Sequence, residues 1–160
     1  MPAVTPLFDS SVIPEQARGE LPSGLVLRPL QLDDYERGHL DLLSTLTRAP
    51  DIGQQAWQMR FQEMASTRGT YYGIVLVDSA TDKLVATGTL VHERKFIRGG
   101  GTVGHIEDIA VSPTMQGKGL GKRIIDALVA ISQHLGAYKA PFYVKCGFET
   151  KGCEMARYNV

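Results

Sequence analysis

The sequence predicts a single domain of the α+β class, with helices packed against a central β-sheet. Three observations support this prediction. The chain has 160 residues, which suits one domain with a sizeable core. Strand-like runs at 71–77, 84–94 and 104–111 follow one another closely along the chain, as in a meander. One strand and two helices precede them, and a glycine-rich loop and a helix follow, which is typical of an α+β sandwich rather than of a doubly wound sheet.

The first segment, residues 1–22, carries four prolines among scattered polar residues. We expect a mobile N-terminal arm here, followed by the folded domain at 23–160. The first strand is predicted at 25–30. Because proline cannot donate a hydrogen bond to a strand ladder, Pro29 places this strand at a sheet edge or marks its end.

Two helices are expected next. Asp33 or Asp34 can cap the first helix, and its apolar face recurs at helical spacing through Tyr35, His39, Leu42, Leu43 and Leu46. The second helix is expected to begin at Asp51, with Gln54 as the second member of a capping-box-like pair. Its buried face is formed by Trp57, Phe61 and Met64.

The three consecutive strands have short connections. Residues 79–83 have the length of a hairpin loop, and three glycines at 99–101 make the next connection flexible. The strand at 104–111 contains an adjacent carboxylate pair, Glu107 and Asp108. Because side chains alternate across a strand, we expect these two carboxylates to face opposite sides of the sheet.

A glycine-rich loop at 116–123, with the sequence QGKGLGKR, separates this strand from an apolar helical run at 124–131. The first N–H groups of a helix have no partner within it, and the helix dipole adds positive charge there. Glycine also lets a ligand approach the main chain closely. The loop therefore predicts a cradle for a phosphate or pyrophosphate, the alternative being a glycine turn that only caps a core helix.

Two common phosphate-binding motifs do not fit this loop. A P-loop requires Ser or Thr after its Gly-Lys pair, but Arg123 follows Lys122. A dinucleotide-binding motif requires its third glycine one position after Gly121, and an acidic residue at the end of a following strand. The spacing therefore excludes both kinds of site.

The composition excludes several classes of protein. Lys plus Arg and Asp plus Glu both number 17, so no overall charge favours nucleic acid or an anionic membrane. The two cysteines, Cys146 and Cys153, fit a reduced cytoplasmic protein better than a disulfide framework, and no spacing of histidines and cysteines predicts a metal site. No apolar run has membrane-spanning length, and the N-terminus lacks the layout expected of a signal peptide. We expect a soluble, intracellular protein.

The pattern Gln-x-x-Gly-x-Gly at 116–121, after an acidic strand, resembles the acetyl-CoA loop of the GCN5-related N-acetyltransferases, the GNAT superfamily. Three further motifs are similar to those of the fungal-type glucosamine-6-phosphate N-acetyltransferases: Glu-Arg-Lys-Phe-Ile at 93–97, Gly-His-Ile-Glu-Asp-Ile-Ala-Val at 104–111, and Phe-Tyr-Val-Lys-Cys-Gly-Phe at 142–148. The resemblance runs from residue 21 to the C-terminus. It implies a GNAT fold with a mixed sheet, and transfer of acetyl from acetyl-CoA to the 2-amine of glucosamine 6-phosphate, on the route to UDP-N-acetylglucosamine, by a homodimer that shares substrate contacts.

The chemistry and the resemblance together assign the site residues. The acetyl oxygen gains negative charge in the transition state, and we expect the main-chain N–H of Ile109 to bind it. The resemblance makes Tyr143 the general acid for the departing thiolate. The expected acetyl-CoA contacts are Ile109, Ala110, Val111, Gln116, Gly117, Lys118, Gly119, Leu120, Gly121 and Lys122. By resemblance, the amino sugar phosphate contacts Thr47, Lys95, Phe96, Ile97, Arg98, Glu107, Asp108, Tyr138, Lys139 and Arg157, and no metal takes part.

The chain departs from the family at one place. Only Ala140 and Pro141 separate Lys139 from Phe142, where the family has a fifth strand and a turn. A strand takes about five residues, so this strand is shortened or missing. The chain is then a mis-spliced or truncated product, a natural variant that has lost activity, or a protein that rebuilds a shorter wall. A GNAT enzyme for another amine, and an inactive variant that binds CoA or dimerises, stay open as alternatives.

Overall fold

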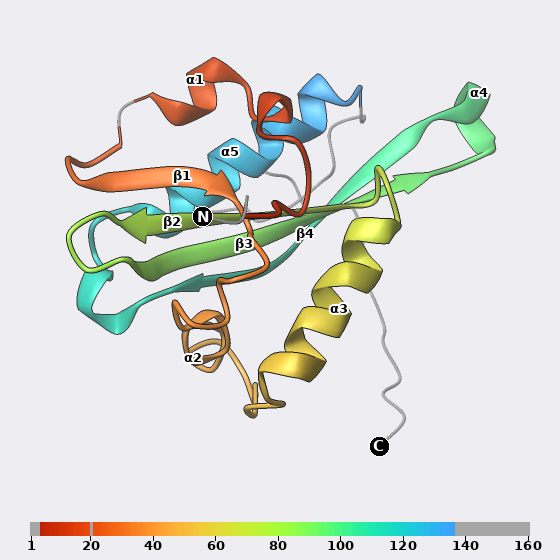
Figure 1. The fold of residues 1–160 in the computed structure, drawn as a ribbon. Coiled ribbons are helices and arrows are strands. Elements are labelled where there is room, and N and C mark those ends of the chain that lie inside the picture. The colour runs from red at the N-terminus through yellow and green to blue at the C-terminus, as the bar shows by residue number, and fades with distance from the viewer. Residues whose placement is uncertain (1–3, 20, 137–160) are drawn as a thin grey trace.

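A computed structural model describes residues 4–19 and 21–136 of the chain (Figure 1). Its centre is a four-stranded antiparallel sheet with the strand order β1-β2-β3-β4. The strands are β1 (Leu25–Pro29), β2 (Tyr71–Asp78), β3 (Lys83–Arg94) and β4 (Thr102–Val111). The predicted meander is confirmed, and Pro29 ends the edge strand as the sequence indicated.

Helices cover both faces of this sheet. The α-helices of the described residues are α1 (Glu15–Arg18), α2 (His39–Leu43), α3 (Gln54–Ser66), α4 (Ile97–Gly100) and α5 (Leu120–His134), of which α4 lies away from the sheet faces, and short 3-10 helices lie at Ser10–Val12 and Pro113–Met115. Figure 1 shows α1 and α5 on one side of the sheet and α2 and α3 on the other. The predicted α+β class is confirmed.

Each face has its own core, because side chains on a strand alternate between faces. The α5 face joins Ile74, Leu76 and Leu90 of the sheet to Ile124 and Leu128 of α5, all of them fully buried. The opposite face joins a second set of buried residues, which are Leu30, Leu42, Trp57, Phe61, Val75, Val77 and Ala110. The residues that were expected to face the core on the second helix, Trp57 and Phe61, do so.

The N-terminal segment differs from the expected mobile arm. The main-chain N–H of Leu7 donates to the carbonyl oxygen of Leu30 at 2.8 Å. Leu7 and Ile13 are buried in the two cores, and the ring of Phe8 packs edge-on against Tyr72. The apolar pairs of this segment therefore pack residues 4–19 against the domain despite its prolines.

The two helices after β1 also begin later than expected. Asp34 does not cap a helix. Its buried carboxylate instead receives two hydrogen bonds from the Arg28 guanidinium, at 2.7 and 2.8 Å, and α2 starts only after Gly38. Asp51 likewise precedes α3, which starts after Gly53. In both cases the aspartate makes another hydrogen bond instead of capping the helix. Asp34 accepts from Arg28 on β1, and Asp51 accepts from the main-chain N–H of Gly53.

Every strand pairing in residues 4–19 and 21–136 is antiparallel, so the expected mixed sheet is not found within this part of the chain. The shortened or missing fifth strand was expected between Lys139 and Phe142, which lies outside the described residues. The long β3–β4 hairpin extends beyond the body of the domain and carries α4 at its tip (Figure 1).

Candidate functional site

The glycine-rich loop forms an open turn at the start of α5. Gly117 and Gly119 have left-handed φ angles of 79° and 74°, and no atom of the described residues lies within 4 Å of the position that a Cβ would take at either residue. Gly119 is the N-terminal cap of α5, and no side chain within 4–19 or 21–136 caps this helix end. Residues 116–119 are exposed. The predicted anion cradle thus has the open space and the helix N-terminus that a diphosphate requires.

The strand before this loop contains a bulge. Thr87 pairs with Ala110 and Thr89 pairs with Glu107, so Asp108 and Ile109 together lie opposite the single residue Gly88. Asp108 has a left-handed φ of 54°, which is uncommon for a residue with a side chain. A bulge of this kind re-aims a side chain and locally interrupts the ladder.

The bulge overturns the expectation that Glu107 and Asp108 face opposite sides. Glu107 lies opposite Thr89, and Asp108 lines a cavity together with Thr89, so both carboxylates lie on the α3 face. The Ile109 side chain turns to the α5 face, where it approaches Gly88. The extra residue adds one step to the alternation, which is why simple alternation gave the wrong answer.

A cavity of about 300 Å³ lies beside the bulge, between the sheet and the α2–α3 region. Most of its wall is apolar and is formed by Leu40, Leu43, Ile52, Trp57, Phe61 and Met64. Its polar groups come from His39, Arg60, Thr87, Thr89 and Asp108. A mostly apolar hollow with a few convergent polar groups is the usual form of a small-molecule site.

His39 contributes a neutral imidazole to this cavity. Burial lowers the pKa of His39 to about 4, and the negative charge of Asp34 offsets only part of the effect. The indole N–H of Trp57 donates to Nδ1 of His39 at 3.2 Å. In the neutral ring, the proton is therefore on Nε2, which has no hydrogen-bond partner within the part of the chain that the structure describes.

The tip of the β3–β4 hairpin carries four of the ten residues expected to contact the amino sugar phosphate, at positions 95–98. Phe96 and Ile97 are exposed, and Arg98 lies in a left-handed turn. Lys95 Nζ donates to Glu93 Oε1 at 2.6 Å, and His105 Nε2 lies 2.9 Å from Glu93 Oε2. The hydrogen bond from Lys95, and then that with His105, lowers the pKa of Glu93. Apolar side chains on an extended tip are poor partners for water, and this tip has no covering element among the described residues.

The other expected site residues fall in three places. Thr47 lies in the exposed turn that follows α2. Lys118 and Lys122 lie in the loop and the first turn of α5, where the Lys122 ammonium pairs with Asp126 at 2.6 Å. Tyr138, Lys139, Tyr143 and Arg157 lie outside the described residues. Within a single chain, the structure therefore brings Asp108 and Ile109 together but leaves the hairpin residues apart from them.

Comparison with known proteins identifies the family. The acetyltransferase (GNAT) family model matches residues 30–148. The chain belongs to the GNAT acetyltransferase family. Two relatives called glucosamine 6-phosphate N-acetyltransferase 1 are similar to it. The protein from Oryza sativa subsp. japonica is 40% identical over 82% of this chain and 86% of its own length, and that from Dictyostelium discoideum is 41% identical over 84% and 91%.

The solved structures agree with this assignment. The crystal structure of glucosamine-6-phosphate N-acetyltransferase from Arabidopsis thaliana has a TM-score of 0.78 and 30% identity, and the match covers 84% of this chain and 97% of that one. GNAT acetyltransferases use acetyl-CoA as acetyl donor, and the glycine-lined turn before α5 has open space around its two left-handed glycines. In the described residues, no helix has the length and apolarity to cross a membrane.

The sequence contained a signal for the bulge that the alternation argument missed. Ile106 and Ile109 are three residues apart, so one strand of strict period two cannot bury both on one face. Asp is also among the few residues that tolerate a left-handed φ. The cavity had no such signal, because it depends on where α2 and α3 come to lie against the sheet.

Proposed function

We propose that this chain transfers the acetyl group of acetyl-CoA to the 2-amine of D-glucosamine 6-phosphate, giving N-acetylglucosamine 6-phosphate. The observation that carries the proposal is its 40–41% identity, over more than four-fifths of the chain, to two relatives of that name. The route to UDP-N-acetylglucosamine and a cytoplasmic location are part of the proposal, since both follow from the same substrate pair.

The bulge suits acetyl transfer because it places a carboxylate next to a main-chain donor. The carboxylate of Asp108 can hold the substrate ammonium, and the N–H of Ile109 can bind the acetyl oxygen as it gains negative charge. Acetyl-CoA supplies the activated acetyl group when it is bound. Gln116, Gly117 and Gly119 then position its diphosphate, and Tyr143 donates the proton that the departing thiolate needs.

The spacing of the expected sugar contacts supports a site shared by two chains. The main chain of Lys95 hydrogen-bonds to Gly101, so Lys95 lies seven positions before Asp108 along β4. At about 3.3 Å per residue, this separates the two residues by roughly 20 Å, which is longer than one hexose phosphate. We therefore propose a homodimer in which the hairpin tip of one chain supplies Lys95 and Arg98 to the phosphate at Asp108 of the other.

The short connection before Phe142 is expected to reduce the rate of acetyl transfer, because it affects where Tyr143 is placed. We expect slower turnover than in a version of the chain with a full fifth strand inserted after Lys139. Equal rates for the two proteins, measured by release of the CoA thiol, would show that a shorter wall suffices.

The test of the function is a thiol-release assay with acetyl-CoA and three acceptors. Glucosamine 6-phosphate should be acetylated, whereas glucosamine, which lacks the phosphate, and glucose 6-phosphate, which lacks the amine, should not. Turnover of free glucosamine at the same rate would contradict the proposal. Calorimetric binding of CoA with no turnover of any acceptor would instead support the inactive, CoA-binding alternative.

A further inference from the structure

Glu93 connects two basic side chains near the tip of the β3–β4 hairpin. Its Oε1 accepts a hydrogen bond from Lys95 Nζ at 2.6 Å, and its Oε2 lies 2.9 Å from Nε2 of His105. Because an ionised carboxylate only accepts hydrogen bonds, the imidazole is the donor in the second contact, and its proton is on Nε2. Each carboxylate oxygen of Glu93 therefore holds one partner.

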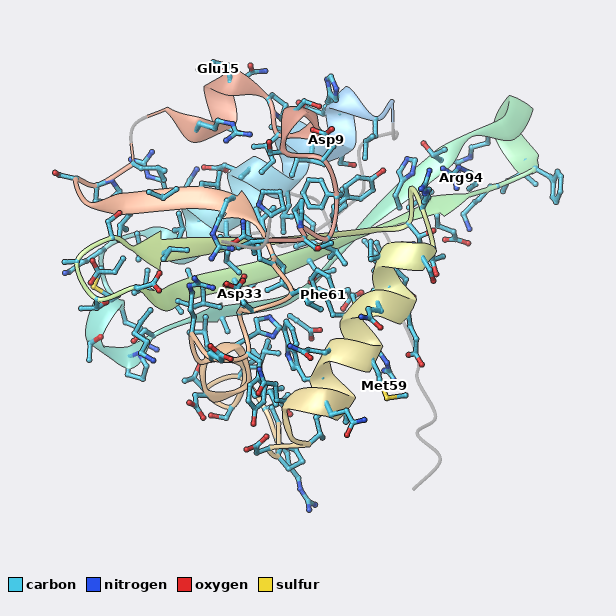
Figure 2. The ribbon with its side chains drawn as sticks, in the orientation of Figure 1. Asp9, Glu15, Asp33, Met59, Phe61 and Arg94 are labelled. Atoms are coloured by element: carbon cyan, nitrogen blue, oxygen red, sulfur yellow. The ribbon has the colours of Figure 1, made fainter. Side chains whose placement is uncertain are left out.

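The strand geometry puts these three side chains on the α3 face of the sheet. His105 lies two positions before Glu107 on β4 and so shares its face, and Glu93 is its diagonal neighbour across the ladder. Lys95 follows Glu93 by two positions, which gives it the same face. Arg94, between them in the sequence, extends the other way, and Figure 2 shows it beside the loop that joins α3 to β2.

These contacts can do more for the position of Lys95 than for stability. The three side chains are between 33% and 44% exposed on a hairpin that extends beyond the body of the domain (Figure 1), and ion pairs at such exposure contribute little to folding. A lysine ammonium has three donors on a flexible four-carbon stem. Within the part of the chain that the structure describes, Lys95 uses one donor on Glu93, so its ammonium is held in place with donors left for a ligand.

We propose that Glu93 and His105 are positioning residues for the phosphate of the acceptor. His105 holds Glu93, and Glu93 holds the Lys95 ammonium where it can donate to the phosphate oxygens. The inference rests on the proposed function, in which Lys95 contacts that phosphate in the dimer. The carboxylate of Glu93 also repels a phosphate, so its charge opposes binding while its hydrogen bond to Lys95 favours it.

Two substitutions of Glu93 separate position from charge. Glu93→Ala removes both hydrogen bonds, and Lys95 then loses rotamer freedom only when the phosphate binds, so we expect the KM for glucosamine 6-phosphate to rise about fivefold. Glu93→Gln keeps an oxygen for Lys95 and removes the charge, so its KM should not exceed that of the unchanged chain. His105→Ala releases Glu93 from one side only and should raise the KM about twofold. The kcat and the KM for acetyl-CoA should stay the same in all three variants.

Asp82→Asn is the matched control. Asp82 accepts a hydrogen bond from Arg37 Nε at 2.9 Å, next to the other end of β3, so the variant removes one negative charge from an exposed ion pair far from the hairpin tip. Asn tolerates the left-handed φ of 52° at this position. The kinetic constants of this variant should equal those of the unchanged chain. Thermal unfolding shows whether each variant is folded, and His105→Ala serves if Glu93→Ala is not.

Each contrary result has its own meaning. An unchanged KM in Glu93→Ala, or a fall in kcat in place of the rise in KM, overturns the positioning role and leaves the proposed function standing. A lower KM in both Glu93 variants also overturns it, because Glu93 would then only compete with the phosphate for Lys95. If the unchanged chain does not acetylate glucosamine 6-phosphate, the proposed function fails, and calorimetric dissociation constants for this sugar test the inference by the same ratios. Absence of any binding would overturn both.

Discussion

The two faces of the sheet are filled differently. On the α5 face, side chains meet so closely that a methyl group at Gly88 would overlap Ile109 and Ile124, and one at Gly104 would overlap Ser132. On the α3 face, the same strands border a cavity of about 300 Å³ and a network of charges. One face is packed to the density of a protein interior, and the other keeps space and polar groups available. The contrast separates a closely packed face from one that leaves room for a small molecule.

The largest effect is expected on the α5 face. Leu128 is fully buried against the sheet, and Leu128→Ala should lower the free energy of unfolding by about 4 kcal/mol because the close neighbours cannot collapse into the space. Leu43→Ala, next to the existing cavity, should cost less than about half of that. Urea unfolding measures both. Equal losses would show that the two faces are packed alike.

A smaller effect is expected from the charges of the α3 face. Arg28→Met removes the two hydrogen bonds that the guanidinium donates to the fully buried carboxylate of Asp34, which keeps Arg37 Nη1 at 3.3 Å and the main-chain N–H of Gln31 at 2.8 Å. We expect a loss of about 3 kcal/mol, since removing one partner of a buried charge is costly. Arg60→Met breaks the exposed pair with Glu63 and should cost less than about 1 kcal/mol. If the two variants unfolded at the same urea concentration, the network around Asp34 would have no stabilising role.

The pH dependence of stability should also come from the α3 face. The pKa of His39 is lowered to about 4 in the folded state, so below pH 6.5 the unfolded chain binds a proton that the folded chain does not. Stability is complete above pH 6.5 and falls as the pH drops toward 4, by about 2 kcal/mol between pH 7 and pH 5. His39→Gln should flatten this part of the curve. An unchanged slope in that variant would assign the dependence to other groups.

The smallest effect is expected where the α5 face opens, at its glycine loop. Gly119→Ala should cost about 1 kcal/mol from its left-handed φ, and its methyl group should weaken acetyl-CoA binding about tenfold. Gly24→Ala, with a φ of 83° and equally open surroundings, has the same strain but lies outside the loop. Calorimetric titration should find normal acetyl-CoA affinity for the Gly24→Ala variant. A similar loss in both variants would remove the loop from the binding site.

The sequence predicted the strands and α5 well because their signals are local. Alternation and apolar runs depend on neighbours a few residues away, and so does the glycine loop before Leu120. The start of α2 was mispredicted because Asp34 is committed to Arg28, a partner on another element. The packing of Leu7 and Ile13 was missed for the same reason, since the prolines around them carry a stronger local signal than two isolated apolar residues.

For the candidate site, too, the parts with local sequence signals could be predicted and the parts that depend on tertiary structure could not. An anion cradle at Gln116, Gly117 and Gly119 was predicted from the glycine pattern before a helix, and the structure has an open turn there. The resemblance supplied the hairpin residues, but it could not give their distance from Asp108 within one chain. The cavity could not be predicted from the sequence. Trp57 and Met64 have the spacing of core residues, and only the position of α3 on the sheet shows that they line a cavity.

The bulge at Asp108 also has a consequence for how such a site can arise. If that one residue were removed, Ile109 would lie opposite Gly88 in a regular strand, and Glu107, Ala110 and Val111 would keep the faces they have now. A single-codon insertion can thus add a carboxylate at the edge of the cavity without displacing any other side chain.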